Sequence, residues 1–122
     1  MKKKENSEEK LLETIIEAIK EKKGKDIVSI DLTGIENTLF DVFVICHGES
    51  TTQVEAIADS IEFKTKEELG IKPSHIEGMQ NAQWVLIDYR GIVVHVFLNQ
   101  QREFYRLEDL WSDGELSVHN DD

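Results

Sequence analysis

The sequence predicts an α+β fold, with two main helices and a short C-terminal helix packed on a mixed sheet of four or five strands. Two segments carry apolar residues at helical spacing, and several short runs are rich in β-branched residues. Their order along the 122 residues is α-β-β-α-(β)-β-β-α. A chain of this length typically forms one domain. We expect residues 1–122 to form a single domain, with its core over about 8–112 and a flexible acidic tail over 113–122.

The first expected helix begins at Asn6, because an Asn followed three residues later by Glu9 is a capping pattern. Gly24 suits its C-terminal cap. The apolar residues between them recur at helical spacing, at Leu11, Leu12, Ile15, Ile16 and Ile19. These positions predict an amphipathic helix with a charged outer face.

Two strands and a second helix follow. Residues 27–32 alternate in a strand-like pattern, and residues 40–46 are nearly all apolar from Val42 onward. Continuous apolarity predicts a central strand that is covered on both faces. The second helix starts after the turn at residues 48–52, turns Val54, Ala58 and Ile61 inward, and ends at Gly70 before the only proline, Pro73.

The C-terminal half contains a hairpin and a short helix. Residues 76–78 form either a short strand or a linker. Residues 84–88 and 92–97 are two strands joined by three residues that end in Gly91, which favours a hairpin with a bulge. Residues 103–110 predict the short terminal helix, in which Arg102 or Arg106 can pair with Glu108.

The expected sheet has more apolar surface than two helices can cover, because the last hairpin is apolar on both faces. If the helices cover one face, the other keeps an apolar patch that commonly marks an interaction surface. Alternatively, the terminal segment and the loops cover that patch. His95, inside the last strand, is then either a core histidine with both ring nitrogens satisfied or part of a binding face.

Composition narrows the range of functions. The formal charge is −11, from 14 basic and 25 acidic residues, and this argues against electrostatic binding to DNA or RNA. It fits a partner with a basic surface. A single cysteine, Cys46, allows no internal disulfide and indicates a reducing compartment. With no secretory signal and no apolar stretch long enough for a membrane span, we expect a cytoplasmic protein without membrane contact.

The motifs of several enzyme classes are missing from the sequence. It contains no glycine-rich phosphate loop and no paired metal-ligand motif, and its four histidines lack metal-type spacing. Cys46 and His47 are neighbours on a strand, so their side chains point to opposite faces. We therefore expect no catalytic residues, no metal site and no cofactor, and we interpret Cys46 as a small buried residue.

The segments together resemble the ribosomal silencing factor family, also called RsfS or Iojap. The resemblance spans roughly residues 12–112. It rests on the residues of the second strand with Gly48, on Trp84-Val85-Leu86-Ile87-Asp88-Tyr89, and on Val93-Val94-His95-Val96-Phe97 followed by Arg102 through Trp111. The acidic extension 113–122 runs past the Trp ending that is usual in the family.

The resemblance implies a fold related to the nucleotidyltransferases but without their catalytic motif, since Gly48-Glu49-Ser50 is interrupted and Asp88 has no second carboxylate two residues on. It implies binding to the large ribosomal subunit through its ribosomal protein number fourteen, with little direct RNA contact. The small subunit would then be unable to join, and translation would fall. Our expected interface comprises Glu77, Trp84, Leu86, Asp88, Tyr89 and His95.

Two other functions stay open at this point. One is a nucleotide-binding or transferase-like enzyme on the related fold, which ATP or magnesium would stabilise. The other is a homodimeric interaction module, in which self-association consumes the apolar face. A homodimer of the free protein that opens on the ribosome is compatible with the silencing function.

Overall fold

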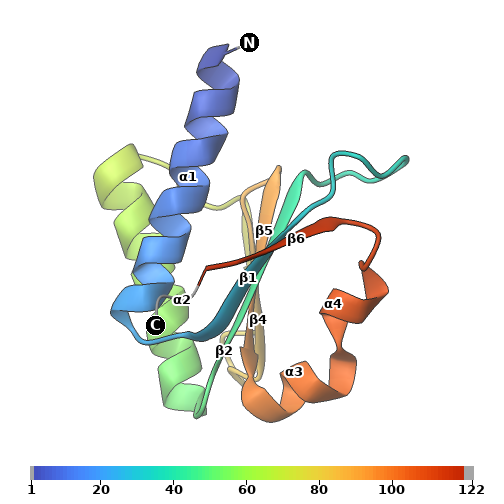
Figure 1. Ribbon diagram of the computed structural model, residues 1–122. Coiled ribbons are helices and arrows are strands. Elements are labelled where there is room, and N and C mark those ends of the chain that lie inside the picture. The colour runs from blue at the N-terminus through green and yellow to red at the C-terminus, as the bar shows by residue number, and fades with distance from the viewer. Residues whose placement is uncertain (1, 120–122) are drawn as a thin grey trace.

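A computed structural model describes residues 2–119 of the chain, with side chains from residue 7 onward, so the last three residues of the expected tail lie outside it. Helices and strands follow one another in the predicted α+β order as far as residue 105, and a further helix and a sixth strand come after it (Figure 1). The elements are α1 (Lys2–Glu21), β1 (Lys25–Asp31), β2 (Val42–Gly48), α2 (Thr51–Leu69), β3 (His75–Glu77), β4 (Trp84–Asp88), β5 (Ile92–Leu98), α3 (Asn99–Tyr105), α4 (Leu107–Leu110) and β6 (Glu115–Val118).

The strands form one mixed sheet with the order β3-β4-β5-β2-β1-β6. Only the central pair, β2 and β5, is parallel, with Val44 opposite Val94, and the other neighbours are antiparallel. The parallel pair requires a long crossover, which α2, β3 and β4 provide. The prediction of β2 as a central strand is confirmed, because its residues Phe43 to Gly48 are all buried.

Helices α1 and α2 lie side by side over one face of the sheet (Figure 1). The core beneath them combines the apolar stripes of both helices with alternate residues of β2, β4 and β5. Among its fully buried members are Ile15, Ile19, Ile57, Ile61, Val44, Val85, Ile87 and Val96. Burying each such aliphatic side chain contributes about 1.5–3 kcal/mol, so this layer is the main source of stability.

The opposite face carries a second and smaller core, which α3 and α4 cover in part (Figure 1). Phe43, Ile45 and Phe97 are buried there, and Leu107 of α4 packs on them. Five more apolar side chains reach this core but stay only half-buried: Ile35, Phe40, Trp84, Leu86 and Trp111. Both expectations for this face therefore hold in part, since the terminal segment covers one end and leaves the other open.

The C-terminal region differs from the predicted single helix over 103–110 followed by a frayed tail. The helix starts earlier, at Asn99, and is broken at Arg106, whose backbone adopts the left-handed conformation with φ 48°. After α4 the chain returns to the sheet as β6 and pairs with β1, Val118 opposite Val28. The sheet has six strands for this reason, where we predicted four or five.

The hairpin between β4 and β5 is confirmed, but its left-handed residue is Arg90, with φ 79°, and not Gly91. The Asp88 carboxylate accepts a 2.7 Å hydrogen bond from the Arg90 amide and holds the turn. Gly91 leaves room for two neighbouring carboxylates, since a Cβ there would lie 2.6 Å from Glu8 Oε2 and 3.1 Å from Asp41 Oδ2, the ends of flexible side chains that would have to shift.

Candidate functional site: the open face of strands β3 to β5

A row of side chains crosses β3, β4 and β5 on the face that α1 and α2 do not cover. The register sets Glu77 opposite Leu86 and Leu86 opposite His95. Trp84 lies two residues before Leu86 and therefore on the same face. The structure thus brings together four of the six predicted interface residues, Glu77, Trp84, Leu86 and His95.

Trp84, Leu86, Glu77 and Gly78 line a shallow groove of about 260 Å³. Glu77 is exposed and the two apolar side chains are half-buried, so the groove has an apolar floor and an acidic rim. Gly78 is needed for its shape, because its φ is +93° and a Cβ there would collide with the Trp84 carbonyl oxygen. A groove of this kind can accept an apolar side chain that lies next to a basic one.

His95 supports Trp84 from beneath. The Trp84 indole N–H donates to His95 Nδ1 over 3.1 Å, which leaves the ring proton on Nε2. That nitrogen is buried and has no hydrogen-bond partner among residues 7–119. The His95 ring meets Phe43 edge-on at 4.7 Å between centroids. Burial lowers the His95 pKa to about 4, so the ring is neutral near pH 7. Of the two alternatives for His95, the structure has the core histidine, 4% exposed beneath the predicted interface, with one ring nitrogen satisfied in place of both.

Aromatic side chains hold Trp84 on its other sides. Its ring centroid lies 4.8 Å from that of Phe97 and 4.7 Å from that of Tyr105, which is itself 50% exposed. Contacts of this kind contribute about 0.5–1.5 kcal/mol each beyond area burial. Trp84 is therefore a rigid, half-exposed aromatic anchor, the residue type enriched in binding hot spots.

Of the other two predicted interface residues, Asp88 follows Leu86 by two residues and so lies on the same face at the end of β4, outside the groove, whereas Tyr89 lies on the opposite face. Asp88 is half-buried at the end of β4, where its carboxylate caps the turn. Tyr89 points to the helix-covered side, is 8% exposed, and its hydroxyl lies 2.8 Å from Thr65 Oγ1 of α2. Burial raises the Tyr89 pKa. The expectation that Tyr89 shares the Trp84 surface is wrong, because successive strand residues alternate between the faces.

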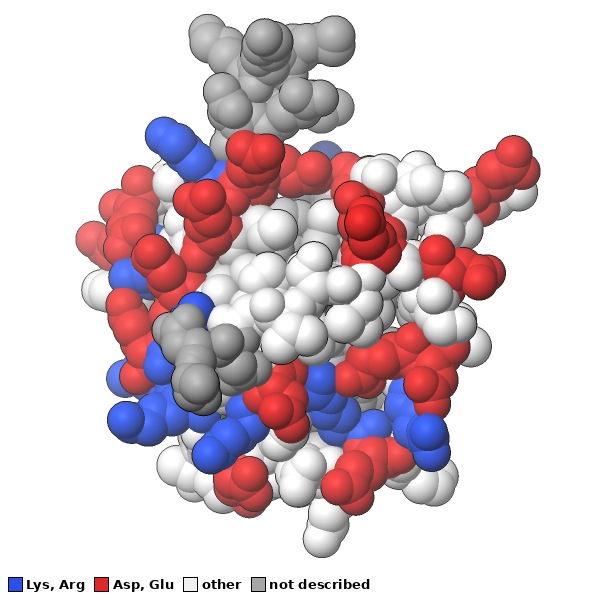
Figure 2. Space-filling model, viewed as in Figure 1, with Lys and Arg blue, Asp and Glu red and all other residues white. Residues whose placement is uncertain are grey.

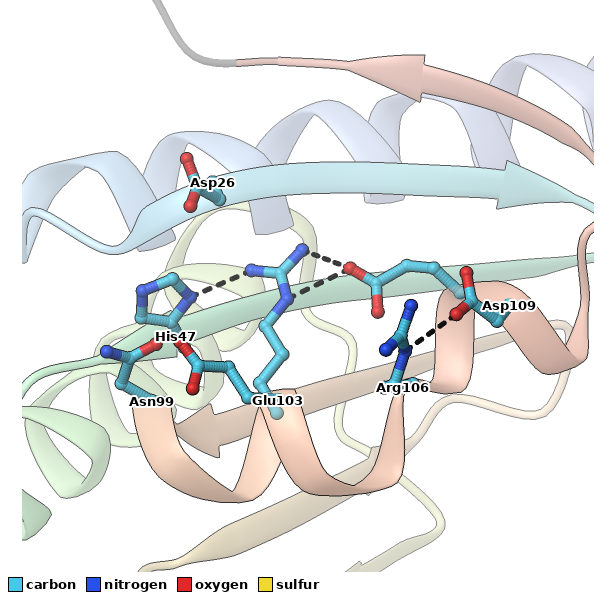
Figure 3. A pocket seen from close by; sticks show the side chains of 8 residues that line it. Asp26, His47, Asn99, Glu103, Arg106 and Asp109 are labelled. Carbon is cyan, nitrogen blue, oxygen red and sulfur yellow. Dashed lines mark hydrogen bonds and ion pairs between the residues drawn. The ribbon is translucent and has the colours of Figure 1, made fainter.

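A polar pocket of about 330 Å³ lies at the carboxyl ends of β2 and β5 (Figure 3). Arg102 of α3 crosses it and is 9% exposed. Its guanidinium donates to Glu108 Oε2 at 2.6 and 2.9 Å, to His47 Nδ1 at 2.9 Å and to the Lys25 carbonyl at 3.3 Å. Burial and the neighbouring Arg102 charge lower the His47 pKa. The predicted pairing of Arg102 with Glu108 is confirmed.

The Arg102 network ties α3 and α4 to the start of β1 at Lys25 and to the end of β2 at His47. Arg106 instead pairs with Asp109 at 2.8 Å on the surface, and both side chains are mostly exposed. The His47–Arg102 contact could not be predicted from the sequence, although Ile45 and His47 are two residues apart on β2 and so both face the α3 side. The network fixes the position of Tyr105, and through it one side of Trp84.

Two further features bear on chemistry. Cys46 is fully buried under the helices, and burial raises the pKa of its thiol to about 12, so it is the inert small residue that we predicted. Across the described part of the chain, no group of three or more His, Cys, Asp or Glu side chains is arranged to hold a metal ion. Within residues 2–119 no helix combines the length and apolarity needed to cross a bilayer.

Comparison with known proteins identifies the family. The family model described as "Ribosomal silencing factor during starvation", RsfS, matches residues 4–122. The chain is 42% identical over 108 residues to a ribosomal silencing factor RsfS of Halalkalibacterium halodurans, covering 88% of this chain and 91% of the relative. It is 40% identical to that of Bacillus subtilis, covering 91% and 92%. The chain belongs to the ribosomal silencing factor family.

Solved structures agree with this assignment. A crystal structure of a Chromobacterium violaceum protein superposes with a TM-score of 0.81 at 34% identity, over 93% of this chain and 92% of that one. One from Bacillus halodurans gives 0.75 at 41% identity, over 84% and 94%. The fold class is therefore shared with known structures. The RsfS family model matches as far as residue 122, so the acidic extension 113–122 is part of the matched region and not an addition to it.

Proposed function

We propose that this protein binds the large ribosomal subunit through its ribosomal protein number fourteen and blocks the small subunit from joining, which represses translation in the cytoplasm. Family membership is the observation that carries the proposal. A mouse relative, 27% identical over 106 residues, is named for mitochondrial assembly of the ribosomal large subunit. The mechanism is steric and requires no catalytic residue, metal or cofactor.

The docking surface in this proposal is the groove formed by Glu77, Gly78, Trp84 and Leu86. Trp84 presents a half-exposed ring that neighbouring aromatic rings already hold in place, so little conformational entropy is lost on binding. Glu77 at the rim and Asp88 at the strand end supply negative charge. His95 and Tyr89 act from below the surface, the first by holding the Trp84 indole and the second by fixing β4 on α2.

The charge of the protein favours a protein partner over RNA. Figure 2 shows acidic side chains over much of the visible face, with basic ones gathered towards one end. The net charge of −11 repels a phosphate backbone and attracts a basic ribosomal protein. Opposite charges speed and orient the encounter, while apolar anchors such as Trp84 set the lifetime of the complex.

Co-sedimentation with purified large subunits tests the docking surface. The double substitution Trp84→Ala and Asp88→Lys should weaken binding at least about tenfold, as for loss of an aromatic hot spot. Phe63→Ala with Asp59→Lys is the matched control, because Phe63 is 68% exposed on α2 and distant in the sequence from the groove. If both double variants co-sediment like wild type, the proposed surface is wrong.

Subunit reassociation in a gradient tests the silencing step. Adding the protein to separated subunits should shift them away from whole ribosomes, and the Trp84→Ala, Asp88→Lys variant should not. An unchanged proportion of whole ribosomes at saturating protein would refute silencing, even if the large subunit is bound.

A further inference from the structure

The outer edge of β6 is a second exposed surface, at the opposite end of the strand order from β3 and β4, which carry the groove. β6 is the last strand in the order β3-β4-β5-β2-β1-β6, so only one of its two edges is paired with a described strand. All four of its residues are exposed, including the apolar Leu116 at 47% and Val118 at 69%. An unpaired strand edge with apolar side chains is a template for another strand.

The direction of the free backbone groups follows from the pairing with β1. Val118 lies opposite Val28, and the His119 amide donates to the Ile27 carbonyl over 2.8 Å. This pattern makes Val118 and Val28 a non-hydrogen-bonded pair, whose own amide and carbonyl groups point away from each other. The same holds two residues earlier for Leu116. Leu116 and Val118 therefore direct two N–H donors and two carbonyl acceptors outward.

β6 is firmly held in place, which an edge for strand addition requires. Besides the ladder with β1, the side chain of His119 bonds Ser29 Oγ over 2.7 Å, just past the end of the strand. Burial and Lys20 lower the His119 pKa, which is consistent with a neutral ring in this contact. The free edge is thus presented as a preformed strand.

The surroundings of the edge indicate the charge of the occupant. At the start of β6, Asp31, Asp113 and Glu115 line a hollow of about 250 Å³, and no described Lys, Arg or His forms an ion pair with any of them. Figure 2 shows uncharged surface over β6 with acidic side chains beside it, both over α1 and toward the loop end. Asp31 accepts hydrogen bonds from the Thr33 amide and hydroxyl, which leave its negative charge in place. Carboxylates without a described ion-pair partner at one end of an apolar strand attract a basic side chain and oppose pairing with a second acidic copy.

We infer that β6 takes up an extended segment of a partner protein that alternates apolar and basic side chains, by strand addition at its free edge. The backbone of the segment pairs with Leu116 and Val118. Its apolar side chains lie along theirs, and a lysine or arginine enters the hollow of Asp31, Asp113 and Glu115. Backbone pairing supplies affinity in this binding mode, and side-chain pockets supply specificity. This interface is separate from the groove at Trp84 and goes beyond the proposed function.

A fluorescent peptide of alternating valine and lysine tests the inference by anisotropy, with hydrogen exchange to locate the contact. We expect saturable binding that weakens with salt, and slower exchange at the Leu116 and Val118 amides. Asp113→Asn with Glu115→Gln should weaken binding about tenfold, whereas Glu67→Gln with Glu68→Gln on α2 should not. Val118→Pro removes an outward donor but no bond to β1, so it should also weaken binding.

Peptide controls keep the test valid if Val118→Pro disturbs the strand. A peptide methylated at alternate amides on its pairing edge, and one with glutamate in place of lysine, should both fail to bind wild type. Equal binding of the glutamate peptide, or protection at Trp84 in place of β6, would overturn the inference. So would a wild-type dimer with protected β6 amides, which would assign the edge to a second copy. The Trp84→Ala, Asp88→Lys variant should still bind the peptide, so this result is independent of ribosome docking.

Discussion

The ion pair between Arg102 and Glu108 should be among the largest polar contributions to stability in this fold. Replacing Glu108 with Ala leaves a guanidinium that is 9% exposed without its carboxylate. Breaking a buried pair costs about 3–5 kcal/mol. Because the Glu108 side chain is 25% exposed, water can enter, and we expect a loss of about 2–3 kcal/mol after this discount.

The chain provides a matched control at Asp109, the residue directly after Glu108. Arg106 and Asp109 form an ion pair of similar length, 2.8 Å, but their side chains are 72% and 66% exposed. Exposed pairs contribute about 0–1 kcal/mol, so Asp109→Ala should cost at most about 0.5 kcal/mol. The two substitutions remove the same kind of group from the same short helix and differ mainly in burial.

Urea and thermal unfolding measure both effects. With roughly 4 °C per kcal/mol for a domain of this size, Glu108→Ala should lower Tm by about 10 °C and Asp109→Ala by about 2 °C or less. The double variant Arg102→Met, Glu108→Leu should regain most of the loss, since it buries no unpaired charge. Equal losses for Glu108→Ala and Asp109→Ala would refute the assignment of the Arg102 network as a buried tie.

Three further predictions concern the same structure. Because burial lowers the His95 pKa to about 4, the unfolded state binds its proton first. The neutral ring contributes its full stability above about pH 6.5, and up to about 3 kcal/mol of this is lost as the pH falls toward 4. The urea midpoint of His95→Phe should therefore fall less over this range than that of wild type. Parallel plots of the two urea midpoints against pH would contradict the reasoning. Gly78→Ala should destabilise the fold by more than about 2 kcal/mol, since φ at Gly78 is +93° and the new Cβ meets the Trp84 carbonyl. The control Gly70→Ala, with φ +68° and open space around the new Cβ, should cost only about 1 kcal/mol. Similar unfolding midpoints for the two variants would show that the backbone at Gly78 yields. The Cys46 thiol, fully buried with a pKa of about 12, should resist a thiol-reactive dye at pH 8 until urea unfolds the protein, and rapid native-state labelling would show that α1 or α2 opens.

The central elements of the fold could be predicted because their sequences leave few alternatives. The run from Val42 to Cys46 is apolar throughout, and it became the buried middle strand. The second helix has a clear start and stop. The Ser50 side chain accepts a hydrogen bond from the backbone N–H of Gln53, and Gly70 ends the helix in the left-handed conformation. In such segments local preference and tertiary burial agree, so sequence reasoning succeeds.

The predictions of a single helix and a frayed tail at the C-terminus were wrong because tertiary contacts override local preference there. Residues 115–118 are all exposed in β6, with Leu116 at 47% and Val118 at 69%, so no buried apolar face marks them as a strand that pairs with β1. The residues around Arg106 are good helix formers, and the break there follows from Leu107 turning into the sheet while Arg102 stays in the polar pocket. Neither constraint is visible within a short window of sequence.

The candidate site was predicted in part for a related reason. Strand alternation put Trp84 and Leu86 on one face correctly. Continuing the same alternation one residue past the strand end would have assigned Tyr89 to the side of Val85 and Ile87. The depth of His95 could not be obtained this way, because it depends on Phe43 of another strand and on the position of α3.

The pairing of β1 with β6 has a consequence for the synthesis of the chain. The Ser29–His119 contact spans 90 residues, so the outer edge of β1 stays unpaired until residues 115–119 have been made. Helix α1 and the antiparallel pair of β1 and β2 can form early, since domains fold from the N-terminus as the chain emerges. Closing this long loop adds an entropic cost that only the contacts of β6 and His119 repay. The sheet is therefore complete only after residues 115–119 have emerged from the ribosome that makes them.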